Sequence, residues 1–486
     1  MLVSNNIIST ALARKINIFC LLAAIVLVLA LPFKKEIWYD ETVSIRCSKG
    51  ISHDAPSLLS NLDAASSADL AQLNNVANVF NATVLDNGNS FLYNICLHWF
   101  TLLFGNSLTA YMLLSKLCAI ASLIAFYVLC NLFFRNSIFT SVAILFLATD
   151  NNFMGMSHEI RAYSMGIFFV TIAAIYFFKF LYEKESPFYL FLTGIFSVCA
   201  ILSHFLSVYV ILVFLGALLF TKKARLFSGK NIVAMLIPIT LLATFFYFSY
   251  TGLKLMSTQN HQIQVRNASH SFSIWEAIQR SVKFTAINFK AVFPAFGNRP
   301  IVTIISFLMV FALYVIGIKV TSNIAEKNRL HLLFLLGAAG SLFLLVLSMK
   351  AQHYTSLYYR YYSFCVPFCC LFMAYLLFIF FSSPKFSSLA TGGIIAITLF
   401  PAGLLFLLGV LSARPQLAYN HLVVADKIVQ EKITKMEVPD WENSLLVQCF
   451  LPKGYKIDYV RNLNSPNFTL YKANTIERIP VIKKDS

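Results

Sequence analysis

Long apolar runs recur along almost the whole chain and are separated by short polar stretches. A helix needs about 20 apolar residues to cross roughly 30 Å of hydrocarbon, and most of these runs have about that length. The pattern therefore predicts an all-α polytopic membrane bundle of about eleven transmembrane helices. The predicted helices cover residues 16–33, 107–134, 137–154, 162–182, 188–203, 205–220, 231–250, 301–320, 331–349, 362–382 and 388–411.

The charged residues around these runs predict how the bundle is oriented. Arg14 and Lys15 precede the first run, which is too long for a signal-peptide core and lacks a small-residue cleavage site. We therefore expect a retained helix with a cytoplasmic N-terminus. Lys and Arg also collect in short connectors such as "TKKARLFSGK" and "AEKNR", as is typical of cytoplasmic loops. The longer segments, expected outside the cytoplasm, are 34–106, 251–300, 350–361 and 412–486.

Composition supports the membrane class and excludes others. A chain of 486 residues that is 58% hydrophobic, with a mean hydropathy of +0.72, has too little polar surface to be a soluble protein. Its net charge of +17 follows the short inner connectors, so we expect no nucleic-acid partner. Of ten cysteines, only Cys47 and Cys449 lie in outer segments, and their pairing is left open.

The pattern divides the chain into a membrane domain and a smaller outer domain. Residues 1–411 form the predicted membrane domain, whose first outer loop, 34–106, has helical apolar spacing and is expected to form interfacial helices. Residues 412–486 contain alternating stretches between Pro, Gly and Asn, which predict a small extracytoplasmic domain of mixed α/β character. The inner connectors leave no room for a nucleotide-binding domain, so an activated substrate would have to be carried by lipid.

The first adjacent pair of acids, Asp40 and Glu41 in "WYDETVSI", stands directly after the first apolar run. Charged groups beside hydrocarbon are costly to dehydrate, so the pair favours a functional explanation, although a solvated helix flank would also place acids there. Four later segments fall on the same predicted side, namely "GNSFLYNICLHWFTLLFGNS", "SHEIRAYSMG", "LSHFLSVY" and "YTSLYYRYYSFCVPF". The last three contribute His158, Glu159, Arg161, Tyr163, His204, Arg360 and Tyr361.

Each of these residues alone has a structural explanation. A histidine in a helix turn is more often a satisfied structural group, tyrosines at a helix start are ordinary interfacial anchors, and a flanking arginine can snorkel. Together on one side, they predict a site with a carboxylate for base catalysis and guanidinium groups for a phosphate. This combination suits glycosyl transfer from a lipid phosphate.

The order of "WYDETVSI", "GNSFLYNICLHWFTLLFGNS", "HEIRAYSMG", "LSHF" and "YRYYSFCVP" resembles the GT-C class of integral membrane glycosyltransferases. The resemblance is to the branch that contains protein O-mannosyltransferases and bacterial aminoarabinose transferases. It implies many transmembrane helices, interfacial helices in the first loop and an outer C-terminal domain. It also implies that a sugar passes, with inversion, from a polyprenyl-phosphate donor to a lipid, glycan or protein acceptor.

The resemblance further implies roles for individual residues. Asp40 matches the family's catalytic acid, with Glu41 beside it, and Arg161 matches an Arg-x-Tyr element after the third helix. Arg360 corresponds to a basic residue near the donor phosphate. The remaining candidates, expected to line the substrate site, are His158, Glu159, Tyr163, His204 and Tyr361.

The chain also departs from the family's pattern. Relatives often have a Pro-Pro element where this chain reads "NGNS", and an arginine near Met112, for which Lys116 one turn further on would partly substitute at the donor phosphate. These departures leave the identity of the acceptor open. No cofactor or metal is assigned, although Asp40, Glu41 and Glu159 leave a shared divalent cation open.

Two alternative functions remain at the level of the sequence. A transporter or flippase of lipid-linked sugars would be expected to show inverted repeats and polar residues at mid-membrane, and neither is visible. A ligase or polymerase of surface glycans would be expected to have a large outer loop late in the bundle, whereas the longest such loop here lies between the seventh and eighth predicted helices.

Overall fold

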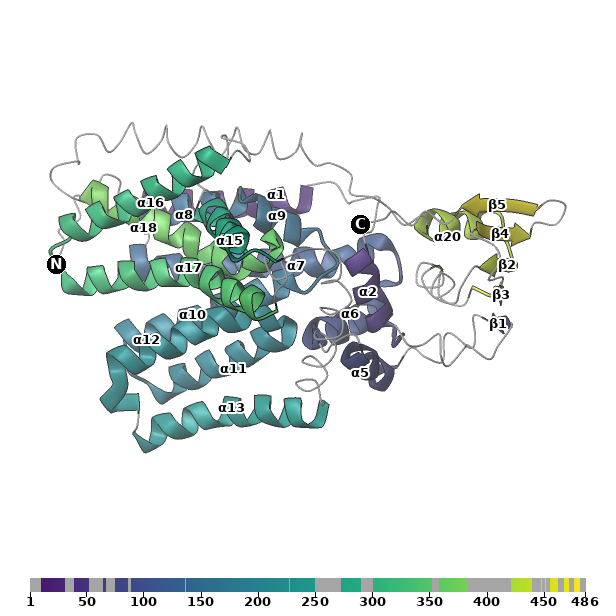
Figure 1. Ribbon diagram of the computed structural model, residues 1–486, viewed down its shortest axis with the longest axis horizontal. Coiled ribbons are helices and arrows are strands. Elements are labelled where there is room, and N and C mark those ends of the chain that lie inside the picture. The colour runs from purple at the N-terminus through teal and green to yellow at the C-terminus, as the bar shows by residue number, and fades with distance from the viewer. Residues whose placement is uncertain are drawn as a thin grey trace.

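The computed structural model describes residues 10–30, 39–51, 64–66, 75–85, 89–135, 137–226, 228–249, 272–289, 300–351, 358–382, 421–438, 455–461, 467–471 and 476–480, with single positions 447 and 451. Within these residues, long helices pack into a bundle, and a small sheet lies beyond one end (Figure 1). The bundle helices are α1 (Thr10–Ala30), α7 (Leu108–Phe134), α8 (Ile138–Ala148), α9 (Asn151–Ser157), α10 (Tyr163–Tyr182), α11 (Pro187–Ser203), α12 (Val208–Leu226), α13 (Gly229–Ser249), α15 (Ile274–Phe289), α16 (Pro300–Val320), α17 (Ile324–Ala351) and α18 (Val366–Ser382). The 3-10 helices η1 (Phe205–Ser207) and η5 (Tyr359–Cys365) precede α12 and α18.

These helices confirm the predicted polytopic bundle. Every predicted run up to residue 382 coincides with described helix, while the last run, 388–411, lies outside the described residues. By length and composition, 6 of the described helices could cross a membrane, and the bent pair α8 and α9 would bring the number to 7. The protein is therefore an integral, multi-pass membrane protein.

The run predicted as one helix over 137–154 is two helices in the structure, so the single-helix prediction is wrong here. The axes of α8 and α9 differ by 63°. Asp150, buried between them, accepts a hydrogen bond from the Phe153 N–H at 2.8 Å and caps α9. The bend leads the chain into the segment that joins α9 to α10, where several candidate site residues lie.

α10 and α18 are buried over most of their length and form much of the core of the bundle. Their packing relies on small residues, because a Cβ atom on Gly166 of α10 would lie 2.5 Å from the Phe364 ring of η5. Such close contacts are a main source of association between helices in lipid, where the hydrophobic effect between them is weak. The contact also holds η5 against the start of α10.

Three shorter helices gather at one end of the bundle, namely α2 (Tyr39–Ser48), α5 (Val76–Leu85) and α6 (Phe91–Phe104) (Figure 1). Buried polar contacts connect α2 to α6. Lys49 Nζ donates to Thr101 Oγ1 at 2.8 Å and to Asn106 Oδ1 at 2.6 Å. His98 Nδ1 donates to the Ser48 carbonyl oxygen at 3.0 Å, and burial lowers the pKa of His98, which keeps its ring neutral. The helix that carries the two adjacent acids is thus fixed at its C-terminal end.

The sheet combines strands of the C-terminal segment, where the sequence predicted a mixed α/β domain, with one strand from the first outer loop. Its strands are β1 (Ala64–Ser66), β2 (Lys435–Val438), β3 (Asp458–Arg461), β4 (Asn467–Tyr471) and β5 (Ile476–Pro480), in the order β1-β3-β2-β4-β5. β2 and β3 are parallel and the other pairs are antiparallel. α20 (His421–Gln430) precedes β2 and completes the mixed α/β character.

Strand β1 differs from the sequence prediction, which gave the first outer loop, 34–106, a helical pattern. In the structure, Ala65 of β1 pairs with Tyr459 of β3. A three-residue strand takes its conformation from its partner, so the local pattern could not indicate it. The first outer loop and the C-terminal segment therefore share one sheet.

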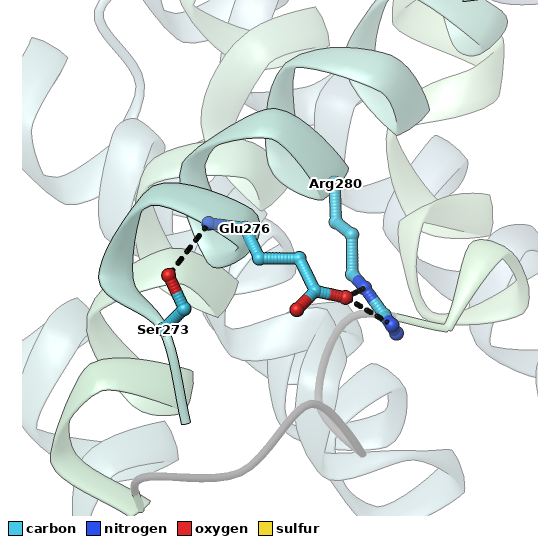
Figure 2. A network of polar contacts seen from close by, with 3 residues as sticks. All are labelled: Ser273, Glu276 and Arg280. Atoms are coloured by element: carbon cyan, nitrogen blue, oxygen red, sulfur yellow. Dashed lines mark hydrogen bonds and ion pairs between the residues drawn. The ribbon is translucent and has the colours of Figure 1, made fainter. Parts of the chain in front are cut away.

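α15 lies in a predicted outer segment and supports η5. At its exposed start, Ser273 Oγ accepts a hydrogen bond from the Glu276 N–H, and Glu276 pairs with Arg280 at 2.6 Å (Figure 2). Such an exposed pair one helical turn apart contributes only about 0.3–0.5 kcal/mol. Further along, Asn288 Nδ2 donates to the Tyr362 carbonyl oxygen at 3.3 Å. α15 therefore packs against η5, the segment that contains Arg360.

Candidate active site

The start of α2 brings together residues from distant parts of the chain. Asp40 Oδ2 lies 2.7 Å from Arg360 Nη2 of η5, and the two side chains are only 25% and 19% exposed. Solvent therefore screens this pair less than it would a surface pair. The guanidinium carbon of Arg360 lies 5.4 Å from the Tyr361 ring centre and 5.5 Å from that of Tyr358. Cation–π contacts thus restrict where the guanidinium group can sit.

Arg161 contacts the same turn of α2 from the segment between α9 and α10. Its Nη1 donates to the Asp40 carbonyl oxygen at 2.8 Å and to Ser44 Oγ at 3.3 Å. Because Ser44 follows Asp40 by one helical turn, a single guanidinium group spans the first turn of the helix. Two arginines therefore converge on Asp40, one at its backbone and one at its carboxylate.

Glu41 occupies a different environment from its neighbour. Its side chain is buried, with 1% exposed, and Oε1 accepts a hydrogen bond from the Ile160 N–H at 2.9 Å. Ile160 directly precedes Arg161, so this bond ties the arginine's segment to α2. Of the two acids, Asp40 is partly exposed and paired with an arginine, whereas Glu41 is bonded to a buried backbone group.

His204 lies at the turn between α11 and η1 and packs against Tyr163, the first residue of α10. The two rings are stacked, with centres 4.7 Å apart. Burial and the positive charges of Arg161 and Arg360 lower the pKa of His204 well below its ordinary value. The turn is also joined to the first outer loop, because the N–H of Phe205, the residue after His204, donates a hydrogen bond to Asn89 Oδ1 at 3.3 Å.

The other predicted site residues have structural contacts. The side chain of His158 packs against the end of α9. Its Nδ1 lies 2.7 Å from Ser157 Oγ and 2.9 Å from the Met154 carbonyl oxygen. Glu159 is buried in the same segment. Lys116 is fully buried in α7, and its Nζ donates to the Leu29 carbonyl oxygen at 3.2 Å, close to the C-terminal end of α1. A cation at this end complements the helix dipole.

Sequence reasoning missed several residues that hold this region together. Ser44 and Lys49 fix the two ends of α2, and Asn89 joins the first outer loop to the turn of His204. Asn89 lies in a polar corner that the sequence singled out, although no contact could be assigned to it. Ser44 carries no signal beyond its spacing of four residues from Asp40. Position 449, whose pairing with Cys47 the sequence left open, lies outside the described residues.

The arrangement offers a carboxylate that can accept a proton and two guanidinium groups that can bind an oxyanion. In the described part of the chain, no three His, Cys, Asp or Glu side chains form a group that could hold a metal ion. The cation that the sequence left open between Asp40, Glu41 and Glu159 therefore has no support there. Instead, Asp40 and Glu41 bond to Arg360 and to a backbone N–H.

Fold and site together define a class, that of multi-pass membrane proteins with an acid and two arginines clustered at one end of a helical bundle. Residues 89–249 match the family described as dolichyl-phosphate-mannose-protein mannosyltransferase, which confirms the resemblance to GT-C glycosyltransferases. The matched segment includes Arg161 and His204, whereas Asp40 and Arg360 lie outside it.

Solved structures of ArnT from Cupriavidus metallidurans are similar to the chain, one bound to undecaprenyl phosphate and one in the apo state. Sequence identity is 11% for the bound form and 12% for the apo form. In both cases the match covers 90% of this chain and 84% of that chain, with a TM-score of 0.37. No match to the chain is found among curated proteins.

Proposed function

We propose that the protein is an inverting glycosyltransferase that moves a sugar from a polyprenyl-phosphate donor to a lipid, glycan or protein acceptor. The class of reaction is supported by the family match over residues 89–249. The single observation that best supports the site is the pairing of Asp40 with Arg360, because it joins the predicted base and a predicted phosphate ligand from opposite halves of the chain. The transfer takes place at the extracytoplasmic face, with the N-terminus in the cytoplasm and the C-terminus outside.

In the proposed reaction, Asp40 accepts the proton of the acceptor hydroxyl. The hydroxyl oxygen then forms a bond to the anomeric carbon of the sugar, from the face opposite the phosphate. The bond between that carbon and the phosphate oxygen breaks, and the polyprenyl phosphate leaves with the electron pair. Arg360 and Arg161 hold the phosphate and offset the negative charge that it gains. The donor phosphate would thus compete with Asp40 for Arg360.

The other predicted residues take supporting roles in this proposal. Glu41 positions the segment of Arg161 through the Ile160 N–H, as its burial and bond suggest. Tyr361 restricts the guanidinium group of Arg360. Side chains that border the same region, and are proposed to contact the substrate, are His158, Glu159, Tyr163 and His204. Lys116 is the proposed additional ligand of the phosphate, and its bond to a helix end makes this the least direct of the assignments.

The test is transfer from a polyprenyl-phosphate sugar by the purified full chain in detergent, with Asp40→Asn as the first variant. The substitution keeps the shape of the side chain and removes the proton acceptor, so we expect turnover to fall by about 10²–10⁴-fold. Glu276→Gln is the matched control, because it alters an exposed carboxylate that is also paired with an arginine. Full turnover by Asp40→Asn would remove this residue from the mechanism.

The same assay separates the proposal from the transporter alternative. A glycosyltransferase forms a covalent product and releases polyprenyl phosphate in detergent, where no membrane separates two compartments. A flippase moves the intact donor across a vesicle membrane and forms no product. Translocation of an unchanged donor by the purified chain, without any transfer to lipid, glycan or peptide acceptors, would therefore overturn the proposal.

A further inference from the structure

The buried ring of His204 has one of its nitrogens fixed by the fold. Its Nδ1 accepts a hydrogen bond from the Leu206 N–H at 3.2 Å, as the cap of the short helix η1. An accepting Nδ1 carries no proton, so a neutral ring must carry its proton on Nε2. The ring is 2% exposed, and burial together with the nearby arginines lowers its pKa, so the neutral form is the stable one. His204 therefore presents an N–H donor at Nε2.

This donor has no hydrogen-bond partner among the residues that the structure describes, and the same is true of the hydroxyl of Tyr163. Both groups are buried, at 2% and 0% exposed, and their rings are stacked. A buried donor without a partner costs about 1–3 kcal/mol, so such a group calls for a partner outside the protein, such as a ligand, an ion or a water. Because the two rings are in contact, one acceptor group bound beside them would serve both donors.

The charges around the pair indicate what kind of acceptor this is. Arg161 and Arg360 lie close enough to His204 to oppose its protonation. A neutral N–H and a hydroxyl beside two guanidinium groups favour an oxyanion over a neutral hydroxyl. Among the groups of the proposed donor, only the phosphate carries negative charge.

From this geometry we infer that His204 Nε2 and the Tyr163 hydroxyl donate hydrogen bonds to an oxygen of the lipid phosphate that Arg161 and Arg360 neutralise. The inference rests on the proposed function and adds a pair of neutral donors to its two charged ones. Neutral donors fix the direction of the phosphate oxygens, whereas the arginines supply the charge. The pair would therefore contribute to affinity for the lipid phosphate itself, whichever sugar it carries.

Two substitutions of His204 separate the donor from the cap. Gln places an amide N–H near the position of Nε2 and loses the cap at Nδ1, whereas Asn keeps an acceptor near Nδ1 and loses the donor. The probe is undecaprenyl phosphate without a sugar, bound to the purified full chain in lipid nanodiscs. Undecaprenol, which lacks the phosphate, is the matched ligand. Thermal unfolding of each variant is measured in parallel.

We expect His204→Asn to bind undecaprenyl phosphate about 10- to 100-fold more weakly than the unaltered chain, and His204→Gln to bind within about threefold of it. Tyr163→Phe, which keeps the stacked ring, should weaken binding by about 3- to 30-fold. Affinity for undecaprenol should be the same for all the variants. This order supports a donor role, because a residue that only caps the turn would rank Asn above Gln.

Equal affinity of the Asn and Gln variants for undecaprenyl phosphate, or weaker binding by Gln than by Asn, would overturn the inference. So would an unchanged affinity in Tyr163→Phe together with an unchanged affinity in His204→Asn. If these results accompany loss of transfer in Asp40→Asn, only the inference fails and the proposed function stands. Failure of the unaltered chain to bind undecaprenyl phosphate would overturn both.

Discussion

The bond between Glu41 and the Ile160 N–H allows a quantitative prediction about stability. Glu41→Met keeps the length of the side chain but removes the acceptor and leaves a buried N–H unsatisfied. Such a loss costs about 1–3 kcal/mol. At this bond, Glu41→Gln keeps a carbonyl oxygen at the same place and loses the strengthening that the charge provides, about 1 kcal/mol. The expected order of stability is the unaltered chain, then Gln, then Met.

The assay is the rate of thermal unfolding of the purified full chain in one detergent, at a single temperature. Rates are preferred because large membrane proteins often unfold irreversibly. A loss of about 2 kcal/mol would raise the rate by up to about 30-fold if the bond is already broken in the transition state. Glu276→Met on α15 is the control, since its carboxylate is 45% exposed and should contribute less than about 0.5 kcal/mol.

The reasoning would be refuted by a Met variant that unfolds no faster than the Gln variant, because the bond to Ile160 would then contribute nothing. Turnover provides a second check. Glu41→Gln preserves the geometry of the segment that carries Arg161, so it should retain most of the activity that Asp40→Asn loses. Equal loss in both variants would indicate that the two acids share the chemistry.

Three further predictions concern the packing around the site and the shared sheet. Gly166→Ala should destabilise the chain by about 1–3 kcal/mol in thermal unfolding, because the added methyl would lie 2.5 Å from a ring carbon of Phe364 in η5. Gly216→Ala is the control and should leave stability unchanged, because a Cβ there would have no atom within 4 Å. Lys49→Met should cost about 1–3 kcal/mol and raise the KM for the donor, since α2 loses its buried contacts with the loop of α6; an unchanged KM and stability would contradict this role. Ser66→Cys combined with Asp458→Cys should form a disulfide on mild oxidation, seen as a mobility shift after proteolysis, because the two residues are paired in the sheet; no cross-link would argue against the strand β1.

The transmembrane helices could be predicted because the length of an apolar run is set by the thickness of the bilayer. The run 107–134 and the helix Leu108–Phe134 agree almost to the residue. The bend in 137–154 was missed, although Asp150 in the middle of that run is a recognisable capping residue. The strand β1 could not be found, because three small residues carry no pattern and depend wholly on pairing with β3.

The site could be predicted only as a set of residues on one side of the membrane. Topology placed Asp40, Arg161 and Arg360 at the same end of the bundle, yet distances between segments that are far apart in sequence depend on helix packing. Nor could the sequence distinguish Asp40 from Glu41, since their difference arises from which way each faces on α2. The protonated nitrogen of His204 likewise depends on a backbone N–H two residues away.

The sharing of one sheet by the first outer loop and the end of the chain has a consequence for biosynthesis. β1 is synthesised early, but its partner β3 is synthesised only after all the described helices of the bundle. Until then the early loop lacks this partner strand. The proposed catalytic carboxylate would therefore belong to a region that matures last. A polypeptide that terminates before β3 would lack a complete site, even with all its helices inserted.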